Sequence, residues 1–189
     1  MITFLPSCQK SEDLLSQLGV VSCNFWVDVP LVLKRKESPV MYIERITREK
    51  ITKFIEENPE SYSILSCYKA IFIGRRLVTK PQNIDDFHKL IKLLSGRNHA
   101  VHSCVIFQHN GKTVIRRTIT RVKMKVISKE EVTLLCHNFE ESFENFWNYT
   151  PKFSRFCIKI VGSYTSLLGL PCYETANILE GVVAKESLT

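Results

Sequence analysis

Glycine is scarce in this chain, at 7 of 189 residues against the ~7% of average proteins. Loops that cradle phosphate on backbone amides need glycine at fixed positions, and neither G-x-G-x-x-G nor G-x-x-x-x-G-K-[ST] occurs. Both of these nucleotide-binding classes are therefore excluded. The sequence also has no run of ~18 apolar residues, so we expect no membrane-spanning helix. Residues 1–6 lack the basic and apolar regions of a secretory signal.

Acidic residues are outnumbered: 19 Asp and Glu stand against 26 Lys and Arg, a formal charge of +7. Such an excess favours polyanionic partners. The seven cysteines are an odd number without a C-x-x-C pair, which is unlike a disulfide framework. We interpret them as buried thiols in a reducing compartment and predict a cytoplasmic protein. The length and ordinary apolar content predict one domain, residues 1–189.

Hydrophobic periodicity and capping residues predict alternating strands and helices, and thus an α/β or α+β domain with a mixed sheet. The predicted strands are Ile2–Leu5, Val20–Val29, Ser63–Cys67, Lys69–Ile73, Ala100–Gln108, Thr113–Ile127 and Phe156–Val161. The predicted helices begin near Ser11, Ser38, Asn83, Ser128 and Pro171, where capping or helix-opening residues stand.

The clearest element is a hairpin around Asn110-Gly111, a type I′ turn signal. On its second arm, alternation predicts that one set of side chains faces inward and another outward. The inward set is Val122, Met124 and Val126, and the outward, basic set is Arg121, Lys123 and Lys125, joined by Arg116 and Arg117. Two interpretations stay open: a solvated edge that blocks aggregation, or a surface for the phosphates of nucleotides or nucleic acid.

Three segments together resemble the Maf family of nucleoside triphosphate pyrophosphatases. Lys80-Pro81, followed after a helix by Leu94-Ser95-Gly96-Arg97-Asn98-His99-Ala100-Val101, is similar to the signature G-K-P, helix, L-S-G-R-x-H-x-V. The stretch from Thr120 to Val132 is similar to T-x-V-x-F and L-S-x-E-E-I, and Ser163–Pro171 is close to Y-x-x-V-x-G-L-P. With matching spacing between them, the resemblance covers nearly the whole chain.

The resemblance implies a Maf/ITPase-like α/β fold whose mixed central sheet splits into two lobes around a cleft. The family cleaves a nucleoside triphosphate to the monophosphate and pyrophosphate, and the resemblance also implies a homodimer. The chemistry needs cations for the triphosphate, a divalent metal such as Mg²⁺ or Mn²⁺ on carboxylates, and a base that activates water.

The cation positions of the family are partly retained. The substrate-binding positions fall on Ser7, Lys10, Lys50, Lys80 and Arg97, and the specificity positions fall on Ser11, Tyr68 and Thr150. An ungapped count places Lys10 and Ser11 on the family's two arginines, whereas a shift of one residue places Ser7 on its first serine. Both registers stay open.

The acidic positions are lost. The family's catalytic Asp falls on Cys67, and an acidic metal ligand falls on Pro30, with Asp28 two residues away. A glycine-rich stretch falls on Glu144–Pro151, where Trp147 and Tyr149 could either stack a base or fill space. We assign no metal ligands, because Cys67 would hold Mg²⁺ poorly.

These departures give the hypothesis of a Maf-fold protein with severely impaired or absent pyrophosphatase activity. The alternative is a non-catalytic protein on the same fold that binds nucleotide, nucleic acid or a protein. A third hypothesis is an active enzyme that uses other acids, such as Asp28 with Asp85 or Asp86.

Overall fold

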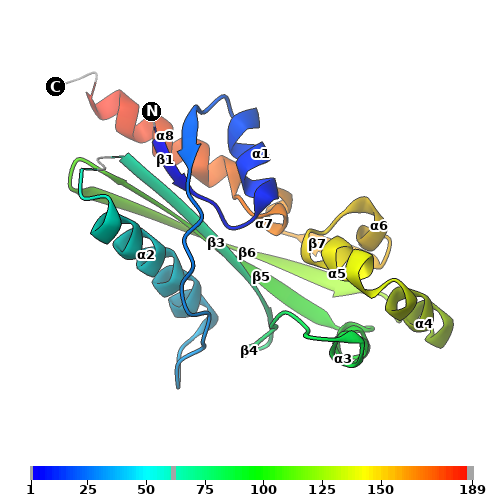
Figure 1. Cartoon of the computed structure of the whole chain (residues 1–189). Helices are drawn as coiled ribbons and strands as arrows, with labels where there is room; N and C mark the ends of the chain where they lie inside the picture. The colour runs from blue at the N-terminus through cyan, green and yellow to red at the C-terminus, as the bar shows by residue number, and fades with distance from the viewer. Residues whose placement is uncertain (1, 61–62, 187–189) are drawn as a thin grey trace.

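The computed structural model describes residues 2–60 and 63–186, which are built around one mixed sheet (Figure 1). Its strand order is β2-β1-β3-β5-β6-β7, and the short β4 pairs with β3. The pairs β2–β1 and β1–β3 are parallel, and the other four pairs are antiparallel. The strands are β1 (Ile2–Leu5), β2 (Ser22–Asn24), β3 (Ser63–Ile73), β4 (Arg76–Leu77), β5 (Asn98–His109), β6 (Lys112–Met124) and β7 (Cys157–Val161).

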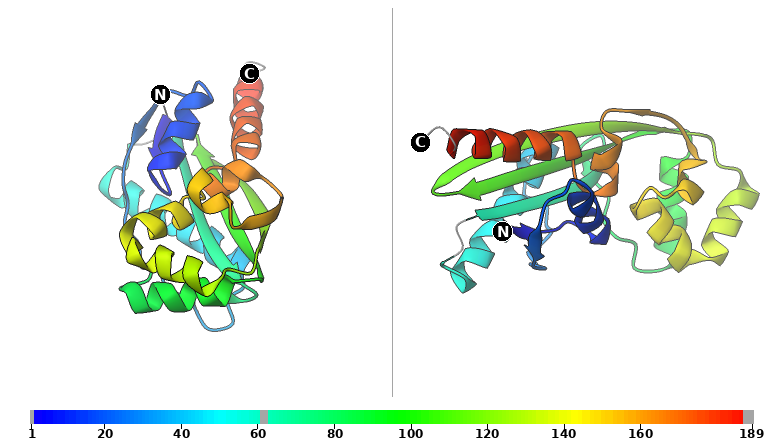
Figure 2. Two further views of the ribbon diagram at one scale, coloured as in Figure 1. Left: turned by 90° about the vertical axis from the view of Figure 1, so that its right-hand side faces the viewer. Right: turned by 90° about the horizontal axis from the view of Figure 1, so that it is seen from above.

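Helix α2 (Pro39–Glu57) packs on one face of the sheet, and two separate groups of helices pack on the other. We call the first group the terminal lobe: α1 (Gln9–Gln17), α7 (Tyr164–Leu168) and α8 (Cys172–Glu186). The second group, the distal lobe, contains α3 (Ile84–Leu94), α4 (Lys129–His137), α5 (Phe139–Trp147) and α6 (Pro151–Ser154). Figure 2 shows the two groups at opposite ends of the long strands. The predicted α/β class with a mixed sheet is confirmed, and the two lobes share one continuous sheet.

The predicted hairpin is confirmed, with Asn110 and Gly111 at φ 47° and 72° as its turn requires. Its second arm is shorter than predicted, because the ladder ends at Met124, next to an irregularity in the pairing with β7. Val122 and Met124 are buried as expected, whereas Val126, beyond the strand, is 79% exposed. The inward placement of Val126 was therefore wrong.

The predicted strand Val20–Val29 is wrong in length, since only Ser22–Asn24 is a strand. Strand β2 is short because it lies at the edge of the sheet, where its partner among the described residues is β1, which is four residues long. Helix α1 also begins two residues earlier than expected. Its N-cap is Cys8, and Ser11 lies at the third helical position.

Helices α5 and α6 were not predicted, and they form the core of the distal lobe. Phe143, Phe146, Tyr149 and Phe153 are almost completely buried there against neighbouring rings. The Phe146 and Phe153 ring centroids lie 4.9 Å apart, and those of Phe146 and Tyr149 lie 6.1 Å apart. Aromatic packing thus fixes this wall of the molecule.

We predict that Phe146→Ala lowers the free energy of unfolding by about 3–5 kcal/mol, because it leaves a cavity among these rings. Trp26→Ala is the control, since Trp26 is 59% exposed and its loss should change stability by less than ~1 kcal/mol. Urea unfolding followed by circular dichroism measures both. Equal losses in the two variants would contradict the distal core described here.

Candidate functional site

A cleft of about 520 Å³ lies between the terminal and distal lobes. Its terminal wall includes the start of α1 and the start of α7, and its distal wall runs from α5 to the start of α6. Its lining includes Cys8, Lys10, Asp13, Trp147, Thr150 and Tyr164. The fold therefore brings two of the predicted site residues, Lys10 and Thr150, to opposite walls of one cleft.

Cys67, on β3, occupies the position of the expected base and is fully buried. Its side chain interacts with Ser11, Cys8 and Lys50, which places it at the base of the N-terminal motif. Burial raises the pKa of the Cys67 thiol to about 11, although the nearby Lys50 charge acts in the opposite direction. The thiol is therefore neutral at physiological pH, and it can serve neither as a general base nor as a thiolate nucleophile.

Lys50, on α2, is only 4% exposed and is bonded to backbone rather than facing an open cleft. Its Nζ donates to the carbonyl oxygens of Leu5 (3.1 Å), Cys67 (3.3 Å) and Pro6. Burial lowers the pKa of this ammonium group. All three of its donors are occupied, so Lys50 fastens α2 to the end of β1 and to the middle of β3.

Lys69 is a buried cation that sequence reasoning missed. It is 2% exposed, and its Nζ donates to the carbonyl oxygen of Trp147 at 2.8 Å and to that of Leu167 at 2.6 Å. Trp147 ends α5 and Leu167 lies in α7, so this one side chain bonds both lobes beneath the cleft. A lysine inside the apolar strand Ser63–Ile73 was the available signal.

The N-terminal motif is held by its own hydrogen bonds. The Ser11 hydroxyl donates to the carbonyl oxygen of Cys8 at 2.6 Å and accepts from the amides of Ser7 and Cys8. The Ser7 hydroxyl accepts from the amide of Lys69 at 3.2 Å. Both serines thus shape the turn that presents Lys10, which is exposed and lies 3.5 Å from Asp13.

The remaining predicted residues lie in different places. Tyr68 packs against α2, on the sheet face opposite Cys67, with its hydroxyl 3.5 Å from that of Tyr42. Lys80 is exposed beside the cleft, 5.3 Å above the Phe143 ring, and lines a hollow that shares Glu144 with the cleft. Arg97 is exposed at the start of β5 and lines none of these hollows. The fold does not gather the five substrate-binding positions.

The residues present do not fit a magnesium ion. In the described part of the chain, no three His, Cys, Asp or Glu side chains come together as a metal site would require. Asp13 and Glu144 line the cleft, but Asp13 pairs with Lys10 and Glu144 accepts from the side-chain amide of Asn148. Cys67 offers a neutral, soft sulfur where the metal prefers oxygen.

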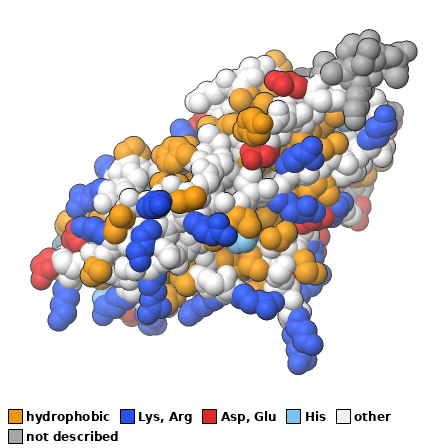
Figure 3. All heavy atoms as spheres, turned by 180° about the vertical axis from the view of Figure 1, so that it is seen from behind, with side chains coloured by type: hydrophobic (Ala, Val, Ile, Leu, Met, Phe, Trp, Pro, Cys, Tyr) orange, Lys and Arg blue, Asp and Glu red, His pale blue; other side chains and the backbone are white. Residues whose placement is uncertain are grey.

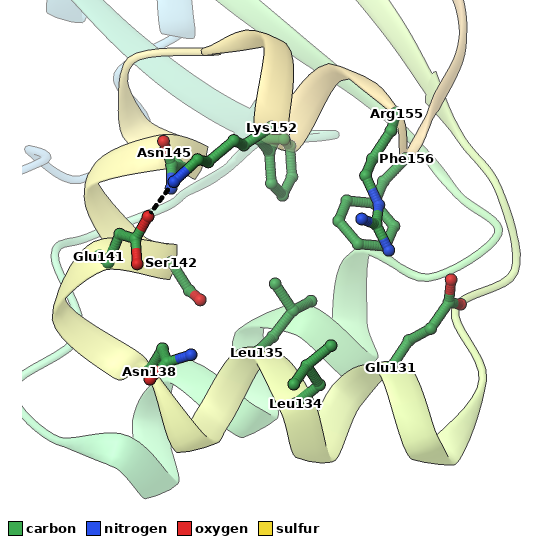
Figure 4. A pocket seen from close by; sticks show the side chains of 11 residues that line it. Glu131, Leu134, Leu135, Asn138, Glu141, Ser142, Asn145, Lys152, Arg155 and Phe156 are labelled. Atoms are coloured by element: carbon green, nitrogen blue, oxygen red, sulfur yellow. Dashed lines mark hydrogen bonds and ion pairs between the residues drawn. The ribbon is translucent and has the colours of Figure 1, made fainter.

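A second hollow, of about 290 Å³, lies within the distal lobe between α4, α5 and α6 (Figure 4). Leu134, Leu135 and Phe156 give it an apolar floor, and the Lys152–Glu141 ion pair crosses one side. None of the sequence-predicted site residues line it. We therefore place the candidate site in the cleft between the lobes.

Trp147 and Tyr149, the two aromatic residues of Glu144–Pro151, have different roles. Tyr149 is fully buried, its hydroxyl lies 2.7 Å from Nε2 of His99, and it fills space. Burial holds the pKa of His99 near 4, so the imidazole is neutral. Trp147 is half-buried and lines the cleft, and its ring also packs 5.6 Å from that of Phe143.

Lys69 gives a prediction on pH dependence. Burial lowers its pKa to about 8, whereas the unfolded chain has the ordinary lysine value near 10.4. Between these values the unfolded state binds more protons, so raising the pH stabilises the folded wild type. Lys69→Met leaves two carbonyls without their donor, and we expect a loss of about 1–3 kcal/mol at pH 9.5 and a smaller loss at pH 7.

Urea unfolding of the wild type, Lys69→Met and the control Lys112→Met at both pH values tests this expectation. Lys112 is exposed at the hairpin turn, so its variant should follow the wild type. A loss for Lys69→Met that shrinks as the pH rises would contradict the buried, depressed lysine.

Comparison with known proteins agrees with the resemblance. The sequence profile of the family described as Maf-like protein matches residues 10–182. A nucleoside triphosphate pyrophosphatase of Ehrlichia chaffeensis is 32% identical over 176 residues, covering 92% of this chain and 91% of that protein. A dTTP/UTP pyrophosphatase of Wolbachia sp. subsp. Brugia malayi is 33% identical, with 92% and 89% covered. A dTTP/UTP pyrophosphatase of Aliivibrio fischeri is 29% identical, and the match covers 90% of this chain and 92% of that protein. This chain therefore belongs to the Maf-like protein family.

Proposed function

We propose that this chain binds a nucleoside triphosphate in the cleft between its lobes and hydrolyses it very slowly or not at all. The observation that carries the proposal is Cys67, a buried and neutral thiol where the family has its catalytic carboxylate. Loss of a general base alone typically costs about 10²–10⁴ in rate. The absence of a fitting metal site adds to that loss.

Binding is supported by the cations that stay accessible. Lys10 at the terminal wall and Lys80 beside the distal wall are exposed, whereas Lys50 and Lys69 are bonded to backbone. Trp147 adds an aromatic surface within the same cleft. A triphosphate would contact the exposed ammonium groups while its base packs on the indole ring.

UTP and dTTP are the ligands to test first, because two of the relatives are named dTTP/UTP pyrophosphatases. Mg²⁺ or Mn²⁺ would enter as part of the nucleotide complex, since the described residues offer it no ligand set. The third hypothesis, Asp28 with Asp85 or Asp86, gains no support from the structure: Asp28 lies in the segment before α2, and the other two open α3.

The other properties expected from the sequence remain proposals. All seven cysteines are free, as suits a protein of the cytoplasm. No described helix is long and apolar enough to cross a bilayer. A homodimer is still implied by family membership alone. The alternative function, recognition of nucleic acid, would use a different surface, the basic face of β6.

We expect UTP or dTTP to raise the melting temperature of the protein while pyrophosphate release stays near the rate without protein. Thermal-shift titration measures binding, and a coupled pyrophosphate assay with Mg²⁺ and with Mn²⁺ measures turnover. Lys10→Gln should weaken binding about 3- to 10-fold, as expected for one charge-assisted contact.

Lys112→Gln serves as the matched control, because it removes one positive charge at the distant hairpin turn. Rapid pyrophosphate release that disappears in Cys67→Ala would refute the loss of activity. If neither nucleotide changes the melting temperature at millimolar concentration, the binding proposal fails.

A further inference from the structure

A basic groove lies on the sheet outside the cleft, on the face that α2 covers only in part. Helix α2 packs over β3 and β5 and leaves the β6–β7 side of the face open. There Ile119 and Val161 are 41% and 49% exposed, and Arg121 and Lys159 are exposed. Figure 3, which views the molecule from behind, shows many Lys and Arg side chains and few acidic ones.

Three of the five basic residues predicted for this surface are engaged elsewhere. Lys125 lies beyond the end of β6, pairs with Glu131 at 2.6 Å and lies over the Phe156 ring. Arg117 pairs with Glu44 of α2. Arg116 is opposite Val105, whose side chain belongs to the core beneath the terminal lobe, so Arg116 faces the other side of the sheet. Arg121 and Lys123 remain.

Register adds a third cation that sequence reasoning did not find. Lys159 on β7 is directly opposite Lys123, and Val161 is opposite Arg121. The side chains of Arg121, Lys123 and Lys159 therefore share one face. Within the described residues, the Arg121 guanidinium and the Lys159 ammonium group have no hydrogen-bond or ion-pair partner, while Lys123 Nζ donates only to the carbonyl oxygen of Gly96, at 2.8 Å.

These cations line a hollow of about 400 Å³, together with Asn98 and Gly74, and no acidic residue lines it. We call this set of residues the β6–β7 groove. The charge of Arg121 also acts on a neighbour: together with burial, it lowers the pKa of His102. The groove is thus a region of positive potential without an internal counter-charge.

Placing Lys123 opposite Lys159 destabilises the sheet, and an edge strand that only faces solvent would not need such a pair. Like charges directly opposite each other on paired strands are destabilising, and Lys123 and Lys159 are such a pair. One lysine would be enough to blunt an edge strand. An anion in the groove would remove the repulsion and supply partners for the free donors of all three side chains.

We propose that the β6–β7 groove binds the phosphate backbone of double-stranded nucleic acid without sequence preference. Arg121 and Lys123 are two residues apart, about 7 Å along the strand, and Lys159 lies about 5 Å across. Together they can contact about three neighbouring phosphates. No Phe, Tyr or Trp lines the groove, and the ring of His99, which does, is buried against Tyr149, so single-strand stacking has no platform.

This surface is separate from the nucleotide cleft: the two share no lining residue. The proposal therefore does not rest on nucleotide binding. A fluorescein-labelled 16-base-pair DNA duplex of mixed sequence, followed by anisotropy, is the probe. With three phosphate contacts, the salt slope should be about −2.7, which corresponds to about 40-fold weaker binding at 200 mM than at 50 mM salt.

The test variant is the triple substitution Arg121→Gln, Lys123→Gln, Lys159→Gln. We expect it to weaken duplex binding at least 30-fold at 50 mM salt and to flatten the salt slope. The control variant Lys89→Gln, Lys112→Gln, Lys129→Gln removes the same charge from exposed sites on α3, the hairpin turn and α4. It should bind within about threefold of the wild type.

Circular dichroism and the UTP-induced thermal shift should be unchanged in the test variant, which separates this result from misfolding and from failure of the cleft. Equal weakening in both variants would mean that net charge alone attracts the duplex, and it would overturn the proposal. Binding to anionic lipid vesicles or to tripolyphosphate without binding to the duplex would also overturn it.

Discussion

The structure depends on two lysines buried beneath the cleft and bonded to backbone carbonyls. Lys50 joins α2 to the end of β1 and the middle of β3, and Lys69 joins the last turn of α5 to α7. A buried ammonium group is tolerated only where its donors are satisfied. Because both side chains donate to backbone carbonyls, Lys69 holds the two lobes together and Lys50 holds α2 to the sheet, and neither charge is presented to the cleft.

This constraint changes what the net charge of +7 means. Part of the positive charge is structural and is not presented to a ligand. Part of the accessible charge lies at two surfaces: Lys10 and Lys80 at the cleft, and Arg121, Lys123 and Lys159 in the β6–β7 groove. Cys67, where the motif comparison predicts the family's carboxylate, is buried and neutral. On the proposed function, the cleft attracts phosphate but lacks the acidic groups that hydrolysis would need.

Much of the fold could be predicted from local signals. The turn at Asn110-Gly111 and the caps at Asn83 and Ser128 lie where the sequence placed them. Strand β2 and the end of β6 could not be predicted, because their lengths depend on partner strands. Helices α5 and α6 depend on rings that meet only in the folded core. The motif comparison located Lys50 and Cys67 but could not show that their side chains are buried, and Lys69 matched no motif.

Binding of a nucleoside triphosphate in the cleft without its cleavage is the property to test first. The most direct measurement is a ³¹P NMR time course of UTP with Mg²⁺ and a stoichiometric amount of the protein, because one spectrum reports both events. The account predicts broadened or shifted β- and γ-phosphate signals and no pyrophosphate resonance over several hours. Growth of UMP and pyrophosphate signals within minutes, or phosphate signals identical to those of free UTP, would contradict it.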